Sequence, residues 1–191
     1  KQIIDSAIHD KLLPPAASVD IFDNVPKVKY KSPPKRALYQ YEKDAIKKAD
    51  LSDRDRALVY ILYGCGLRRE EACCLTRFDF NFSKKELSVN KAIAYDVNDA
   101  VLKDTKNHVH RVVPIPDSVL PFLESYVHSI HGTYLFSMSD GRIITKSSYD
   151  KGWARIIDKL NEVSEQPIVG LTAHIFRHNF CSSLCYRIPE I

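Results

Sequence analysis

Hydrophobic positions in the first half of the chain recur at intervals of three and four residues, which predicts helices. One helix covers residues 41–48, and a second begins after Ser52, where Ser52 and Asp55 have the spacing of a capping box. Gly64 and Gly66 end this second helix, because glycine readily adopts the conformations that follow a helix end. The pattern therefore predicts two consecutive helices followed by a short break.

A third helix is predicted to begin near Leu67 or Arg68. Glu70 and Glu71 suit its first turn, since acidic side chains there complement the helix dipole. Leu67 and Ala72 are expected on its inward face, because their spacing is helical. Arg68 therefore lies at a predicted helix N-terminus.

Apolar and polar positions then alternate as in strands, in residues 86–95 and 108–115. The loop between these strands carries Lys103 and Lys106. Helical spacing resumes afterwards, and Trp153 is expected to be plain core. The later helices cover residues 117–130, residues 147–163 and the chain from Thr172 onward. This order of elements predicts an α+β fold that is mostly helical and contains one small antiparallel sheet.

The chain begins with a short helical pattern and a basic, proline-rich stretch. Residues 1–13 are predicted to be the last helix of a preceding domain. Residues 14–36 hold five prolines and five cationic residues, which predicts a stiff, extended linker. Such a linker can follow a DNA backbone or can be a solvated connection between domains, and the sequence leaves both interpretations open. The cations considered for DNA contact are Lys29, Lys31, Lys35 and Arg36.

Composition narrows the class of protein only slightly. A formal charge of +4 and a pI near 8.7 permit nucleic-acid binding without predicting it. The five cysteines lack zinc-finger spacing, and Cys73 and Cys74 adjoin within a predicted helix, so we expect reduced thiols and no structural metal. The sequence contains neither a span of about 20 apolar residues nor a signal-peptide core, and we expect a cytoplasmic protein.

Two distant segments supply side chains suited to a phosphate. Arg68 follows a Gly-x-Gly break and is expected at a helix N-terminus, where free N–H groups and the dipole favour anions. His174 and Arg177 share one face of the last helix. Each signal is weak alone, because an H-x-x-R pair on a helix is common in structural roles. Together, two arginines and a histidine indicate chemistry at a phosphodiester.

Three segments carry a family resemblance. They are Cys-Gly-Leu-Arg-Arg-Glu-Glu at residues 65–71, the basic strand at residues 104–114 and His-Ile-Phe-Arg-His-Asn-Phe at residues 174–180. In this order they resemble the T-G-L-R-x-x-E, R-x-x-P and H-x-L-R-H-T-F motifs of tyrosine recombinases, the phage integrase family. The resemblance covers the catalytic domain, over residues 36–191. Cys65 stands where the family usually has Thr, and the last motif has Phe for Leu and Asn for Thr.

The resemblance implies a reaction and a role for each side chain. In this family a tyrosine hydroxyl attacks a DNA phosphate and forms a 3′-phosphotyrosyl link, without a metal or other cofactor. Arg68 and Arg177 would bind the nonbridging oxygens, whose negative charge grows in the transition state. Lys106, or Lys103 if the register differs, would protonate the leaving 5′ oxygen. His174 would hydrogen-bond the phosphate or assist proton transfer.

Supporting roles and one absence follow from the same resemblance. Glu71 would orient Arg68 through an ion pair, or would simply be a solvated charge on the helix surface. His178 would be a supporting or structural residue. Arg111 is a further candidate for DNA contact. The family pattern places the nucleophilic tyrosine beyond Ile191, so we expect it to be absent from this chain. Tyr186 is interpreted as a packing or surface residue.

These features predict that residues 37–191 are a recombinase catalytic domain, truncated at its C-terminus. We expect the fragment to be a monomer that binds double-stranded DNA weakly and cleaves nothing. The parent protein is expected to act as a homotetramer on paired recombination sites, in integration or excision of a phage or mobile element.

Two other classes of protein stay open at the level of sequence. A non-catalytic DNA-binding regulator could keep a recombinase-like fold, although it would not need this set of cationic side chains. A metal-dependent nuclease would need clustered Asp and Glu ligands, which are not found near these motifs. Loss of cleavage without loss of binding on removing Arg177 would exclude the first class, and activity in EDTA would exclude the second.

Overall fold

The computed structural model describes residues 2–14, 36–104 and 110–187. The chain divides into two compact units between residues 34 and 35, and each is described by itself. The first unit contains helix α1 (Gln2–His9). Most of the predicted linker lies outside the described residues, including the candidate cations Lys29, Lys31 and Lys35.

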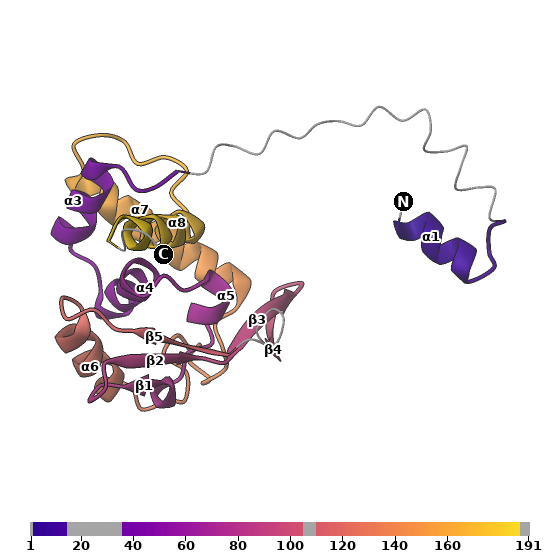
Figure 1. Ribbon diagram of the computed structural model, residues 1–191, viewed down its shortest axis with the longest axis horizontal. Coiled ribbons are helices and arrows are strands. Elements are labelled where there is room, and N and C mark those ends of the chain that lie inside the picture. The colour runs from indigo at the N-terminus through magenta and orange to yellow at the C-terminus, as the bar shows by residue number, and fades with distance from the viewer. Residues whose placement is uncertain (1, 15–35, 105–109, 188–191) are drawn as a thin grey trace. The chain divides into compact units, whose positions relative to one another are not determined.

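The second unit is mostly helical (Figure 1). Its helices are α3 (Gln40–Lys48), α4 (Asp53–Gly64), α5 (Arg69–Ala72), α6 (Leu120–Ser129), α7 (Lys146–Val163) and α8 (Ala173–Arg187), with a short 3-10 helix, η1 (Arg77–Asp79). α4 contacts α5, α6 and α8, whereas α3 packs on α7. The predicted helices are confirmed, although α5 is a single turn. α4 is thus the central helix around which the core forms.

The start of α4 corrects one local prediction. Ser52 is the N-cap, and its Oγ accepts a hydrogen bond from the backbone N–H of Asp55 at 3.3 Å. Asp55 does not return the bond, because its carboxylate accepts two hydrogen bonds from Arg155 of α7, at 2.8 and 2.7 Å. The capping-box prediction was therefore wrong for Asp55, since the Arg155 guanidinium offers its carboxylate two charge-assisted bonds, whereas the backbone N–H of Ser52 would offer one.

The strands form two small antiparallel sheets, not the single sheet predicted. β1 (Phe80–Asn81), β2 (Glu86–Val89) and β5 (Arg111–Pro114) form one sheet in the order β1-β2-β5, and β3 (Lys91–Asp96) pairs with β4 (Asp99–Asp104) in the other. The predicted strand at residues 86–95 changes partner at Asn90, which alternation alone does not reveal. β4 was predicted to be loop. Its side chains are exposed apart from half-buried Ala100, so it carries no hydrophobic alternation.

The turn between β3 and β4 is fixed to the first turn of α7. The carbonyl oxygen of Asn98 accepts from the backbone N–H of Lys146 at 2.9 Å, and its side-chain oxygen accepts from the N–H of Ser147 at 2.9 Å. Thr145, the N-cap, accepts from the N–H of Ser148 at 3.3 Å. Because these bonds satisfy N–H groups that a helix start leaves open, the hairpin and α7 stabilise each other.

α8 enters the core through one aromatic side chain. Phe176 is fully buried, and its ring meets those of Tyr63 and Trp153 edge-on, at centroid distances of 6.2 and 5.7 Å. Trp153 is half-buried and donates from Nε1 to the carbonyl oxygen of Leu171 at 3.0 Å. The buried ring of Phe176 fixes α8 to the core. Among the residues described, none of the helices combines the length and apolar character that crossing a lipid bilayer requires.

Candidate active site

The break between α4 and α5 is shaped by a glycine. Gly66 has a φ of +63°, a left-handed conformation that glycine adopts without strain. The ring of Phe180 lies against it, so a Cβ added at Gly66 would stand 2.2 Å from Phe180 Cδ1. Leu67, between Gly66 and Arg68, is fully buried and fixes this segment to the core. Arg68 follows as the N-cap of α5, with its side chain 46% exposed.

A carboxylate of the chain itself occupies the N-terminus of α5. Glu71 Oε2 accepts from the backbone N–H of Arg68 at 2.9 Å, and Oε1 accepts from Arg68 Nη1 at 2.9 Å. The prediction of free N–H groups for an outside anion was therefore wrong at Arg68, because this reciprocal cap uses the first of them. Of the two roles considered for Glu71, the ion pair is the one observed, since the side chain is only 3% exposed.

Arg111 completes this arrangement from β5. Its Nη1 donates to Glu71 Oε1 at 2.9 Å and its Nη2 to Oε2 at 2.6 Å. Burial by itself raises the pKa of Glu71, but the hydrogen bonds from Arg111 and Arg68 outweigh it and hold the pKa below its ordinary value. At neutral pH a buried carboxylate thus fixes two guanidinium groups, and we call Arg68, Glu71 and Arg111 the Glu71 cluster. DNA contact by Arg111 stays a prediction.

α8 presents the second predicted arginine. Arg177 Nη1 donates to the carbonyl oxygen of Gly66 at 2.6 Å, across 111 residues of sequence. Burial lowers the pKa of Arg177, and the nearby charge of Arg68 lowers it further, although a guanidinium remains charged at neutral pH. His174, one turn earlier, is exposed. Its ring meets that of His178 edge-on, at a centroid distance of 4.3 Å.

Arg68, His174 and Arg177 line one pocket of about 460 Å³. The other residues of its wall are Arg69, Glu70, Tyr149, Asp150, Trp153, Thr172 and Ala173. We call it the arginine pocket. The fold therefore brings together three of the four side chains that the sequence indicated for phosphate chemistry, from α5 and α8. Two guanidinium groups beside a histidine can receive a phosphate through several charge-assisted hydrogen bonds.

The pocket also has an aromatic part, which the sequence motifs did not indicate. The Arg69 guanidinium lies 5.4 Å from the ring centroid of Tyr149 and 5.8 Å from that of Tyr95, and it donates to Glu70 Oε1 at 2.9 and 2.7 Å. Tyr149 and Trp153 stack with a centroid distance of 6.1 Å. Their spacing of four residues is visible in the sequence, but only Trp153 was considered there, as a core residue. Trp153 is both a core contact and part of the pocket wall.

Neither candidate lysine is observed in the pocket. Lys106 lies outside the described residues. Lys103 lies in β4, opposite Ala92 of β3, with its side chain exposed, and it does not line the pocket. Its predicted placement in a loop was wrong, because residues Asp99–Asp104 form a strand. The assignment of the general acid stays a prediction.

Two further residues considered in the sequence, Arg36 and Tyr186, do not line the arginine pocket. Arg36, considered for DNA contact, donates to buried Glu42 at 2.7 and 2.8 Å, and its guanidinium lies 4.5 Å from the ring centroid of Tyr39. This pairing gives Arg36 a structural role at the start of α3. Tyr186 is 90% exposed, which confirms its interpretation as a surface residue.

The thiols are free, and three of them are packed inside. Burial raises the pKa of Cys65, Cys73 and Cys74 to about 12, so these groups are neutral. Cys181 and Cys185 are exposed on α8. Within residues 2–14, 36–104 and 110–187, no three His, Cys, Asp or Glu side chains gather closely enough to hold a metal ion.

Sequence comparisons agree with this geometry. The profile described as the phage integrase family matches residues 36–187. Tyrosine recombinase XerA of Pyrococcus furiosus is 31% identical over 140 residues, which cover 72% of this chain and 43% of the relative. A XerC-like tyrosine recombinase of Caldanaerobacter subterraneus is 27% identical over 169 residues, covering 74% of this chain and 41% of the relative. The chain therefore spans less than half the length of these relatives.

Solved structures with the same fold include two bound to DNA. The integrase of transposon Tn1549, in complex with circular intermediate DNA, has a TM-score of 0.68 at 21% identity, covering 82% of this chain and 56% of that chain. The XerH recombinase bound to its difH substrate has a TM-score of 0.54 at 21% identity, covering 84% and 46%. At such identities the likeness shows the fold alone, and it confirms the mostly helical α+β architecture.

Proposed function

The chain belongs to the phage integrase family, and from this premise we propose that its protein cleaves and rejoins DNA strands at specific sites through a 3′-phosphotyrosyl intermediate. One observation carries the proposal: Arg68, His174 and Arg177 line the same pocket although they come from distant parts of the sequence. The reaction needs no metal, because two guanidinium groups can supply the positive charge that a phosphoryl transition state requires.

The two arginines act on the nonbridging oxygens of the scissile phosphate. Arg68 is held by Glu71, which orients its guanidinium without neutralising the whole pocket, since Arg111 shares the same carboxylate. Arg177 donates from Nη1 to the carbonyl oxygen of Gly66, and its remaining N–H groups can donate to the phosphate. Paired donors on two sides of one phosphate stabilise charge that develops as the new bond forms.

His174 and a lysine complete the proton transfers. His174 is exposed at the pocket and close to Arg177, so it can donate to a phosphate oxygen or assist the attacking hydroxyl. His178 supports it through the ring contact. Lys106 protonates the leaving 5′ oxygen, with Lys103 as the alternative.

The nucleophile in this proposal is a tyrosine outside the pocket wall. Of the described tyrosines only Tyr149 lines the pocket, and its side chain is buried. Burial raises the pKa of Tyr149, so forming the phenolate that attack requires is costly there. Its stacking on Trp153 and its contact with Arg69 give it a packing role.

The partner is double-stranded DNA. Two proteins with this fold were solved with DNA, which supports the assignment here. We further propose that the whole protein forms a homotetramer on paired sites in the cytoplasm, in integration or excision of a phage or mobile element. A chain of residues 1–191 alone is expected to be monomeric and inactive in cleavage.

The test uses the protein expressed from its complete gene, incubated with genomic DNA fragments of its host. Protein–DNA adducts that resist detergent are captured, counted and sequenced. Arg177→Ala is expected to reduce adduct formation about 10³-fold, because it removes one donor set from the transition state. DNA affinity should fall only modestly, with a change of about one in the salt slope. Arg142→Ala, which removes an exposed arginine outside the pocket, is the matched control.

Three results would contradict the proposal. Equal loss of binding and of adducts in Arg177→Ala would favour a DNA-binding regulator. DNA cleavage that EDTA abolishes and that leaves no detergent-resistant adduct would indicate a metal-dependent nuclease. Adducts that form at the same rate in Arg177→Ala and Arg142→Ala would remove the arginine pocket from the reaction.

A further inference from the structure

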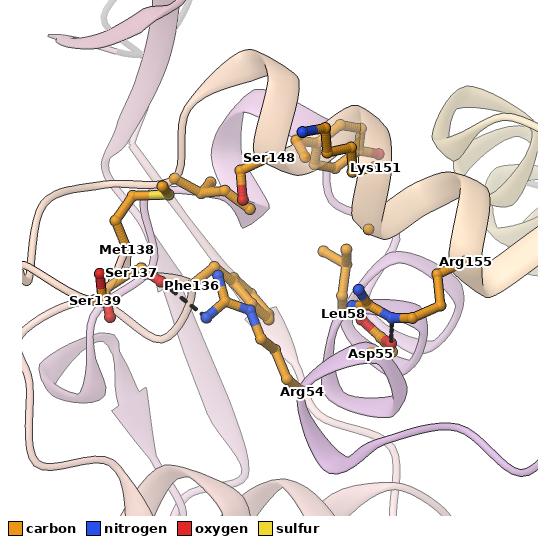
Figure 2. A pocket seen from close by; sticks show the side chains of 13 residues that line it. Arg54, Asp55, Leu58, Phe136, Ser137, Met138, Ser139, Ser148, Lys151 and Arg155 are labelled. Carbon is orange, nitrogen blue, oxygen red and sulfur yellow. Dashed lines mark hydrogen bonds and ion pairs between the residues drawn. The ribbon is translucent and has the colours of Figure 1, made fainter.

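A second pocket, of about 430 Å³, opens beside α7 (Figure 2). The start of α4, residues 136–144 and α7 form its walls. α7 contributes Ser148, Lys151, Gly152 and Arg155 here, whereas it contributes Asp150 and Trp153 to the arginine pocket. Only Tyr149 lines both. The two pockets therefore lie on different faces of one helix.

This second pocket combines an apolar floor with a cationic rim. The floor includes Leu58, Phe136 and Ile144, all buried. Figure 2 shows Arg54 reaching from α4 toward Ser137, with Lys151 on α7 across the opening. An apolar floor under charged groups suits a ligand that carries both an anionic and an apolar group.

The rim has a surplus of positive charge. Arg155 is paired with Asp55, whose two oxygens are both used in that pair. Arg54 donates one N–H group to the carbonyl oxygen of Ser137 at 2.8 Å, which leaves its charge unpaired. In the part of the chain that the structure describes, Lys151 also forms no ion pair. Three cations thus face one carboxylate that is already satisfied, and the pocket is complementary to an anion.

A glycine in the middle of α7 keeps this pocket open. Gly152 lies inside a helix of 18 residues, where glycine costs stability relative to alanine. A Cβ added there would meet only Arg155 Nη2, at 3.8 Å, which is an ordinary contact. The fold therefore does not require glycine at this position. The missing side chain instead leaves room for an occupant.

We propose that this pocket binds a segment of a partner protein in which an Asp or Glu side chain adjoins a bulky apolar one. The carboxylate pairs with Arg54 and Lys151, and the apolar side chain packs against Leu58 and half-buried Met138. Duplex DNA fits less well, because its phosphates lie on a convex surface and bring no apolar group to the floor. The proposal does not depend on the recombination chemistry, since it uses a different face of α7.

The experiment selects random heptapeptides displayed on phage against the purified chain. Selected sequences are synthesised, and their affinity is measured by fluorescence polarisation. We expect enrichment of Asp or Glu beside Leu, Ile or Phe. Gly152→Ala should raise the melting temperature yet weaken peptide binding about fivefold, and Gly152→Leu should weaken it further. Lys151→Ala should weaken it about tenfold. Gly132→Ala, at a glycine with open space around it and outside the pocket, should change neither property.

The other outcomes overturn the proposal. Selection without acidic and apolar neighbours, or selected peptides that bind Gly152→Leu as tightly as the unaltered chain, would remove the pocket as a peptide site. Duplex DNA that competes with the peptides and loses affinity in Gly152→Leu would make this face a nucleic-acid surface. Self-association that Gly152→Leu abolishes, without peptide binding, would make it an interface between copies of the chain. DNA binding of the Gly152 variants is measured in parallel. If it is intact, any of these results counts against the peptide site and not against the recombinase function.

Discussion

The two arginines of the arginine pocket are held in place by contrasting means. Arg68 is fixed by Glu71, three residues along the chain, whose carboxylate also accepts hydrogen bonds from Arg111. Arg177 is fixed by one hydrogen bond to the backbone of Gly66, 111 residues away. The first arrangement is an ion-paired cluster built into a helix start. The second depends on how closely α8 approaches the α4–α5 break.

This difference shows which kind of substitution should disturb each half of the pocket. The Glu71 cluster depends on charge, so it responds to protonation and to loss of the carboxylate. The Arg177 half depends on close packing, because the ring of Phe180 lies where a Cβ at Gly66 would stand and α8 thereby comes close to the Gly66 carbonyl. Perturbing charge and perturbing space should therefore affect the two halves separately.

The largest effect on the free energy of unfolding is expected from Gly66→Ala. This substitution disturbs the close packing of α8 against the α4–α5 break. The new Cβ would stand 2.2 Å from the Phe180 ring and would require a left-handed backbone at a non-glycine residue. Strain and overpacking together should reduce the free energy of unfolding by roughly 3 kcal/mol, measured by urea denaturation. Adding Phe180→Ala should recover part of the loss, because it removes the clash.

Gly132→Ala is the control for this substitution, since its surroundings are open. If Gly66→Ala were as stable as Gly132→Ala, the close approach of α8 to the break would not be a source of stability. The comparison between the two halves would then fail.

A smaller effect on the free energy of unfolding is expected from Glu71→Gln. This substitution removes the negative charge of the Glu71 cluster. The side chain keeps its shape, but its amide group faces guanidinium donors and the buried charge is lost. Because Arg68 is half exposed, we expect a loss of roughly 2 kcal/mol in the free energy of unfolding, less than for a fully buried pair. Glu162→Gln, which alters an exposed pair with Lys159, should show no measurable change.

The smallest effect on the free energy of unfolding is expected from lowering the pH, which protonates Glu71. The pKa of Glu71 in the folded state lies below its ordinary value of 4.5, so its contribution to stability is complete above that pH. The contribution is lost as the pH falls through the lower, folded-state pKa. The free energy of unfolding of the unaltered chain should therefore fall more steeply below about pH 4.5 than that of Glu71→Gln. Parallel curves would show that Glu71 is not the titrating group.

Much of the fold could be predicted because its helices bury one face. α4 and α7 carry regular apolar spacing and recognisable caps at Ser52 and Thr145, and their predicted positions are confirmed. β4 was missed because nearly all of its side chains are exposed, so no alternation marks it. The division into two sheets was missed because the change of partner at Asn90 depends on pairing, which is not local.

The site divides in the same way. The pair of Arg68 and Glu71 could be predicted from a spacing of three residues within one motif. The bonds from Arg111 to Glu71 and from Arg177 to Gly66 could not, because they join segments 40 and 111 residues apart. The role of Arg69 between two tyrosine rings also needed the packing of β3 against α5.

The wall of the arginine pocket contains its own optical reporter. Trp153 is the single tryptophan of the chain, and it lines the pocket with Arg68, His174 and Arg177. Its indole is anchored by the bond to Leu171, so emission comes from one fixed place in the molecule. A change in tryptophan emission when an oligonucleotide binds can therefore be attributed to this wall, without labelling and without a background from other indoles.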